Sequence, residues 1–117
     1  AESIYPDNAE NWIKTLEEKL LDLYKHSDII FYQAGADPHI NDPLGGVLTT
    51  EQMAERDKIV FKVARYLNIP VVWNLAGGYQ TPFEEVLKIH QNTILNWKDI
   101  ECVETRIMSL AADQVDS

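Results

Sequence analysis

Asp37, His39 and Asp42 lie close together where an apolar run, Ile29–Phe31, leaves regular structure. Glycine and proline break the chain here, at Gly35, Pro38, Pro43, Gly45 and Gly46. Carboxylate and imidazole groups bind metals and transfer protons. A strand that ends in such a loop carries these groups to the edge where open α/β sheets bind their ligands. We therefore predict a ligand site within residues 31–46.

A second glycine-rich turn, Gly77-Gly78-Tyr79, follows a second apolar run, Pro70–Leu75. Glycine lets the backbone turn sharply and approach other groups closely. From residue types alone, however, Tyr79 is more often a half-buried packing residue, and Asp42 before Pro43 is more often a turn residue.

Alternating helical and strand patterns surround these two loops. Apolar residues recur at helical spacing in residues 8–25, 49–67 and 81–97, and a further helix is predicted for residues 100–112. Near-continuous apolar runs at Asp28–Ala34 and Pro70–Leu75 predict strands that are buried on both faces. Capping signals mark the helix starts at Asp7 with Glu10, Thr49 with Gln52, and Thr81-Pro82 with Glu84, and Asn68 marks a helix end.

The order α, β, α, β, α predicts an α/β fold with one right-handed crossover and a parallel strand pair. We therefore expect the loops with Asp42 and Tyr79 to leave neighbouring strand ends and to converge on a shared point. Two parallel strands leave both sheet edges without a partner. We therefore expect either that a partner chain completes the sheet or that this chain is the carboxyl-terminal part of a larger α/β domain.

The composition restricts the possible functions. The 117 residues carry 10 Lys and Arg against 19 Asp and Glu, a net charge of −9, so we expect no nucleic-acid partner. An acidic surface can attract a cationic substrate. No apolar run approaches the roughly 18 residues of a membrane helix, so no membrane partner is expected. The single Cys102 favours a reducing compartment, and hence the cytoplasm.

Three segments together resemble the histone deacetylase superfamily, most closely its bacterial and class IV members. They are residues 31–46, Glu55–Phe61 with its Glu-Arg-Asp, and Asn74–Gln80 with its Gly-Gly-Tyr-Gln. The likeness covers about residues 10–95 in order. It implies a three-layer parallel sheet of arginase-deacetylase type, of which residues 1–117 form only the carboxyl-terminal α-β-α-β-α portion. It also implies zinc-dependent removal of acetyl groups from acetyl-lysine or acetylated polyamines.

The resemblance assigns roles to four residues. Asp42 matches a zinc-binding aspartate, Tyr79 matches a catalytic tyrosine, and Gly77 and Gly78 match the turn that approaches the substrate. Zinc polarises an amide carbonyl and lowers the pKa of its water to about 7. A phenol hydroxyl can then donate a hydrogen bond to the oxyanion.

The family also needs a pair of adjacent histidines and an Asp-x-His segment, and this sequence has only His26, His39 and His90. We therefore expect the isolated chain to be inactive and to require the remainder of the domain, or a second copy, as partner. The alternative function is a non-catalytic module that self-associates through its sheet edge.

Other roles remain open at this stage. Asp37 and His39 imitate Asp-x-His and, with Asp42, would offer zinc three ligands and one open position. The favoured interpretation instead makes Asp37 a turn residue that binds backbone amides and His39 a loop residue. His90 is expected to be a satisfied interior histidine, and Glu55, Arg56 and Asp57 to lie on a solvated helix face.

Overall fold

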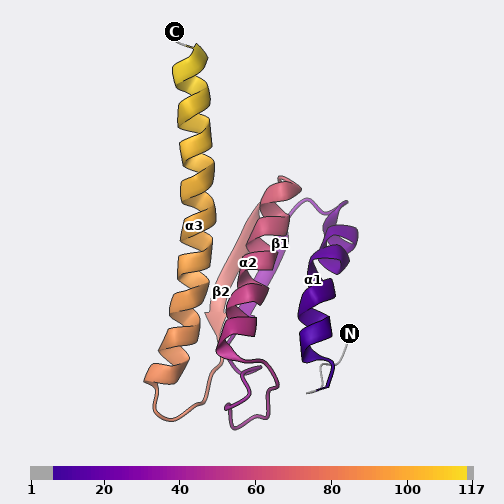
Figure 1. Cartoon of the computed structure of the whole chain (residues 1–117), viewed down its shortest axis with the longest axis vertical. Coiled ribbons are helices and arrows are strands. Elements are labelled where there is room, and N and C mark those ends of the chain that lie inside the picture. Colours follow the sequence, from indigo (N-terminus) through magenta and orange to yellow (C-terminus); the bar gives the residue numbers. More distant parts are fainter. Residues whose placement is uncertain (1–6, 116–117) are drawn as a thin grey trace.

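The computed structural model describes residues 7–115, and the side chains of residues 7–100. Its elements follow the order α1 (Ala9–Tyr24), β1 (Ile30–Gly35), α2 (Thr50–Tyr66), β2 (Val71–Ala76) and α3 (Glu84–Val115). The strands are parallel, with Ile30 opposite Val71 and Gly35 opposite Ala76. The predicted α/β fold and its order of elements are confirmed (Figure 1).

Helix α2 covers one face of the sheet, with α1 and α3 on either side of it (Figure 1). Aromatic rings join the sheet to α2, since Phe61 meets Tyr32 and Trp73 edge to face at 5.9 and 5.5 Å. A second set of buried apolar side chains comes from α1, the β1–α2 loop, α2 and the start of α3: Ala9, Ala36, Leu48, Met53, Val86 and Ile89. These contacts give the loops that follow the strands a rigid support.

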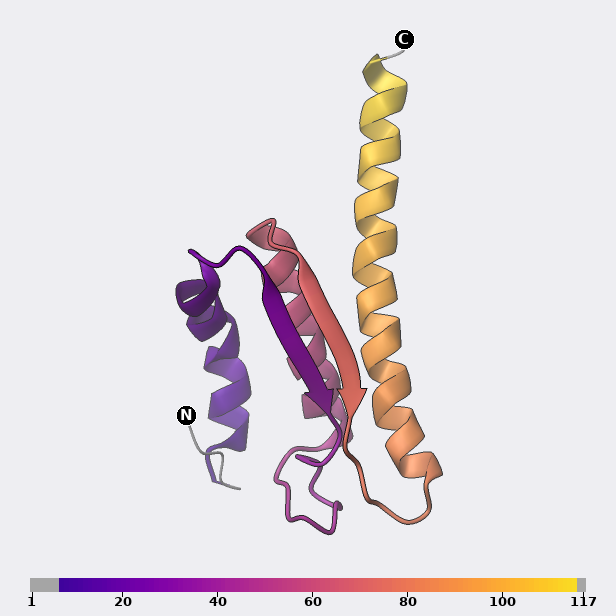
Figure 2. The ribbon, with the colours of Figure 1, turned by 180° about the vertical axis from the view of Figure 1, so that it is seen from behind.

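The opposite face of the sheet has no helix over it among the described residues (Figure 2). Phe31 and Val72 stand opposite each other in the two strands and are 75% and 52% exposed. The prediction that both faces are buried is therefore wrong for this chain by itself. The apolar composition of the strands nevertheless fits a sheet that is covered on both faces.

Helix α2 begins and ends as predicted. The Thr49 hydroxyl accepts from Gln52 N at 3.1 Å and the Gln52 amide oxygen accepts from Thr49 N at 3.0 Å, a complete capping box. Asn68, with φ of 55°, adopts the left-handed conformation that follows the helix.

The other predicted helix boundaries need correction. Helix α1 is capped at Asn8 without a side-chain capping bond, so the predicted Asp7 capping box is wrong. Helix α3 begins at Glu84, because Pro82 lies in the preceding turn, where its carbonyl accepts from Glu85 N at 3.1 Å. The separate helix predicted for residues 100–112 is part of α3, since no glycine or proline interrupts residues 84–115.

None of the helices in the described part of the chain combines the length and the apolar character that crossing a membrane requires.

Candidate active site

The β1–α2 and β2–α3 loops both start at the carboxyl ends of the strands and lie next to each other (Figures 1 and 2). Gly35 and Ala76 are opposite each other, so the parallel strands end at the same level. One further backbone bond, from Ala36 N to Ala76 O at 2.9 Å, joins the first residues of the two connections. The predicted convergence of the two loops is thereby confirmed.

Asp42 joins the two loops through its carboxylate. Its Oδ1 accepts from Leu44 N at 2.9 Å within its own loop, and its Oδ2 accepts from Tyr79 N at 2.8 Å in the other. The side chain is only 4% exposed, which strengthens both charge-assisted bonds. Asp42 therefore stabilises the relative position of the loops.

Tyr79 is anchored by its backbone while its side chain is 58% exposed. The neighbouring Gln80 is buried, and its Nε2 has no hydrogen-bond partner in the described part of the chain. A buried amide without a partner is costly. The Tyr79 ring is thus accessible on an anchored loop, and the Gln80 amide beside it is free to donate further hydrogen bonds.

Gly77 and Gly78 have positive φ angles of 61° and 102°. A Cβ at Gly77 would lie 2.2 Å from Asp37 Oδ1, and one at Gly78 would lie 2.5 Å from Val86 Cγ1. Both positions therefore require glycine for conformation and for space. The turn approaches the Asp37 carboxylate closely, and its approach to a substrate stays a prediction.

The Asp37 side chain is half-buried at the carboxyl tip of β1. Among residues 7–100, none donates a hydrogen bond to its carboxylate. The expectation that Asp37 binds nearby backbone amides is wrong, since Asp42 performs that role through its turn bond to Leu44.

His39 is buried, and both of its ring nitrogens are engaged. Its Nδ1 accepts from Asn41 N at 3.0 Å, and its Nε2 bonds Thr50 Oγ1 at 2.8 Å. Because Nδ1 accepts a backbone hydrogen, the neutral ring carries its proton on Nε2. The site made of Asp37, His39 and Asp42 is not formed. Within the described residues, no three His, Cys, Asp or Glu side chains are grouped so as to hold a metal.

His90, on α3, contacts the glycine turn. Its Nε2 lies 3.3 Å from Gly77 O, but its buried Nδ1 has no partner among the described residues. The prediction of a satisfied interior histidine is therefore wrong for one of its two nitrogens.

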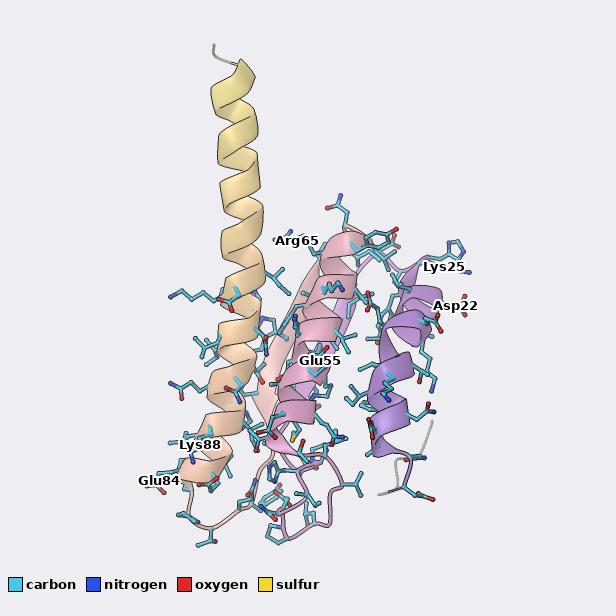
Figure 3. All side chains as sticks on the ribbon, viewed as in Figure 1. Asp22, Lys25, Glu55, Arg65, Glu84 and Lys88 are labelled. Carbon is cyan, nitrogen blue, oxygen red and sulfur yellow. The ribbon has the colours of Figure 1, made fainter. Side chains whose placement is uncertain are left out.

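A buried charge network beneath the loops is the main feature that the sequence did not reveal. Asp57 is 0% exposed and accepts hydrogen bonds from the Tyr32 and Thr93 hydroxyls and from Arg56 Nε and Nη2. Burial, as the largest cause, raises the pKa of Tyr32 above its ordinary value. Only Glu55 of the charged trio lies on the exposed face of α2 (Figure 3).

The prediction that these charged residues lie on a solvated face of α2 is therefore wrong for Arg56 and Asp57. A signal for Asp57 was present in the helical spacing. It follows Met53 by four residues and precedes Phe61 by four, and both are buried apolar residues of α2. A carboxylate on the apolar side of a helix needs buried donors.

The chain matches the histone deacetylase domain family over residues 6–94 and belongs to that family. Its elements are a partial arginase-deacetylase fold. It is 27% identical over 84 residues to an uncharacterized protein of Picosynechococcus sp., a match that covers 69% of this chain and 28% of that protein. It is also 36% identical over 61 residues to histone deacetylase 2 of Arabidopsis thaliana, covering 51% of this chain and 16% of that protein. The chain thus spans less than a third of the curated relatives it matches.

The described residues fit one metal ligand rather than a complete site. A catalytic zinc takes three protein ligands and keeps one position open. The Asp42 carboxylate accepts one backbone N–H at each oxygen and keeps further lone pairs, so it is suited to be one of them. In the described part of the chain, no three His, Cys, Asp or Glu side chains are grouped so that they could hold the metal together.

Proposed function

We propose that this chain is the carboxyl-terminal portion of a zinc-dependent deacetylase domain that acts on acetyl-lysine or acetylated polyamines. The remaining ligands and the proton-transferring histidines come from the rest of that domain, and the isolated chain is inactive. The observation that carries the proposal is the bond from Tyr79 N to Asp42 Oδ2, because it joins the tyrosine turn to the aspartate loop. The lone Cys102 supports a cytoplasmic location.

The chain supplies the metal with one carboxylate from the β1–α2 loop. The sequence motif assigns this role to Asp42, which is buried and accepts one backbone N–H at each carboxylate oxygen. Each oxygen keeps a further lone pair, and carboxylates that bind a metal are commonly hydrogen-bonded in this way. These contacts support Asp42 both as the ligand and as the residue that joins the loops.

Tyr79 donates its phenol hydrogen to the substrate carbonyl oxygen as negative charge develops on it. Its exposed side chain and its anchored backbone support this role. Gly77 and Gly78 let the turn pass close to both Asp37 and the substrate. The zinc, when bound, polarises the carbonyl and activates water.

The test compares Tyr79→Phe with Tyr66→Phe in the complete protein, with an acetyl-lysine peptide as substrate. Tyr66 is an exposed tyrosine at the end of α2 and serves as the matched control. Losing one such donor lowers kcat by about 10²- to 10³-fold. We expect that loss for Tyr79→Phe alone, at unchanged zinc content. Full activity of Tyr79→Phe would refute its role.

Self-association is the second candidate function, and the uncovered sheet face favours it. Phe31 and Val72 form an exposed apolar pair on that face. If this function is correct, the isolated chain forms a stable homodimer in sedimentation experiments without zinc, and Phe31→Glu makes it monomeric. If the chain is part of a deacetylase domain, the remainder of the domain covers this face instead.

A further inference from the structure

His90 connects α3 to the turn that carries Tyr79, because its Nε2 lies 3.3 Å from the Gly77 carbonyl oxygen. Two residues further along the turn, the Tyr79 amide donates to Asp42 Oδ2 at 2.8 Å. The turn is thus bonded at both of its ends. We infer that His90 is a positioning residue for Tyr79, because it fixes the Gly77 carbonyl and so the direction in which the turn presents the phenol. This inference rests on the proposed function.

The hydrogen bond runs from His90 to the turn. A carbonyl oxygen can only accept, so Nε2 carries the hydrogen that it shares with Gly77. In the neutral ring Nδ1 is then an acceptor, and it is buried without a partner among the described residues. An unpaired buried nitrogen destabilises a fold, and an apolar side chain of similar size would avoid that cost. What the imidazole contributes at this position is therefore its bond to the turn.

The two glycines of the turn need support from outside it. Gly77 and Gly78 have φ angles of 61° and 102°, and glycine restricts its own backbone less than any other residue. Val86 of α3 packs against Gly78, where a Cβ would lie 2.5 Å from Val86 Cγ1. Four residues later on the same side of the helix, His90 bonds the Gly77 carbonyl. The packing limits where the turn can lie, and the bond selects the orientation of the peptide between the glycines.

The part of α3 around His90 is itself firmly held. Ile89, the residue before it, is 2% exposed, and the Thr93 hydroxyl, three residues after it, donates to the buried Asp57 carboxylate. A side chain on such a rigid element can place its partner precisely. This precision matters for Tyr79, because a displacement of about 1 Å at a reacting group can cost about 100-fold in rate.

The experiment measures kcat, KM and zinc content of the complete protein, with an acetyl-lysine peptide as substrate. His90→Gln and His90→Asn form a matched pair, because both carry an amide but only the longer glutamine brings its nitrogen to the position of Nε2. We expect His90→Asn to lower kcat about 10- to 100-fold at unchanged KM and zinc content, and His90→Gln to keep most of the wild-type kcat. If His90→Asn does not fold, His90→Leu replaces it, because it leaves no unpaired buried nitrogen.

A second comparison asks whether His90 acts through the phenol. If it does, adding His90→Asn to Tyr79→Phe should cause no further loss of kcat, since the effects of groups that act as a unit are not additive. A full additional loss in the double variant would overturn the inference, as would equal kcat in His90→Gln and in the variant without the donor. Either result would leave the proposed function intact. Full activity of Tyr79→Phe would instead refute the proposed role of Tyr79, and the positioning role with it.

Discussion

The Asp42 carboxylate accepts a hydrogen bond from the Tyr79 backbone amide at 2.8 Å, although the two residues are 37 positions apart in the sequence. The same carboxylate also closes a turn with Leu44 N. One buried side chain thus joins the loop after β1 to the loop after β2. The relationship explains how an exposed tyrosine on a glycine turn can keep a defined position.

Asp42→Ala should destabilise the chain by about 3 kcal/mol, because it removes two hydrogen bonds to a charged acceptor. Asp42→Asn keeps one carbonyl oxygen for Leu44 N and should cost about half as much. Urea unfolding of the three chains measures both values. Equal stability of wild type and Asp42→Ala would show that the loops do not depend on this side chain.

The two aspartates of the β1–α2 loop should differ in their effect on metal affinity in the complete protein. Asp42→Asn removes a ligand and should abolish tight zinc binding, because an amide is a much poorer zinc ligand than a carboxylate. Asp37→Asn should leave the zinc affinity nearly unchanged. Calorimetric zinc titration separates them. Tight binding by Asp42→Asn with loss in Asp37→Asn would contradict the assignment to Asp42.

Gly77→Ala should be more harmful than Gly45→Ala. Both glycines have positive φ, which costs another residue about 1 to 2 kcal/mol. A Cβ at Gly45 meets nothing within 4 Å, whereas at Gly77 it would lie 2.2 Å from Asp37 Oδ1. Urea unfolding should therefore show a larger loss for Gly77→Ala. Equal stability losses would mean that Asp37 moves away without cost.

Stability should decrease at alkaline pH through Tyr32. Its folded-state pKa is raised, chiefly by burial, while the unfolded value is about 10. Above about pH 10 the unfolded chain loses the proton that the folded chain keeps, so this contribution is complete below that pH and declines as the pH rises. Between about pH 9 and about pH 11, the urea midpoint should fall more for wild type than for Tyr32→Phe. An equal fall of the midpoint in both proteins would contradict a raised pKa of Tyr32.

The sequence was sufficient to predict the order of elements and the meeting of the two loops. Both follow from local patterns, since apolar periodicity defines each element and a right-handed crossover makes the strands parallel. The capping box at Thr49 was equally predictable, because both of its partners lie within four residues.

Long-range polar contacts were not predictable in the same way. Asp57 is neutralised by Arg56 beside it, but its burial also depends on Tyr32 and Thr93, which come from other elements. Likewise, the different bonding of Asp37 and Asp42 depends on which of them reaches the Tyr79 amide. A motif gives the residue types on a loop. Only the folded structure shows which carboxylate accepts hydrogen bonds from the backbone amides.

A zinc titration of the isolated 117-residue chain, followed by an assay on an acetyl-lysine peptide, tests the central claim most directly. Because the described residues group no three metal ligands, we predict neither tight zinc binding nor turnover by this chain, and both in the complete protein. Tight zinc binding with hydrolysis by the isolated chain would contradict the claim that its site is completed elsewhere.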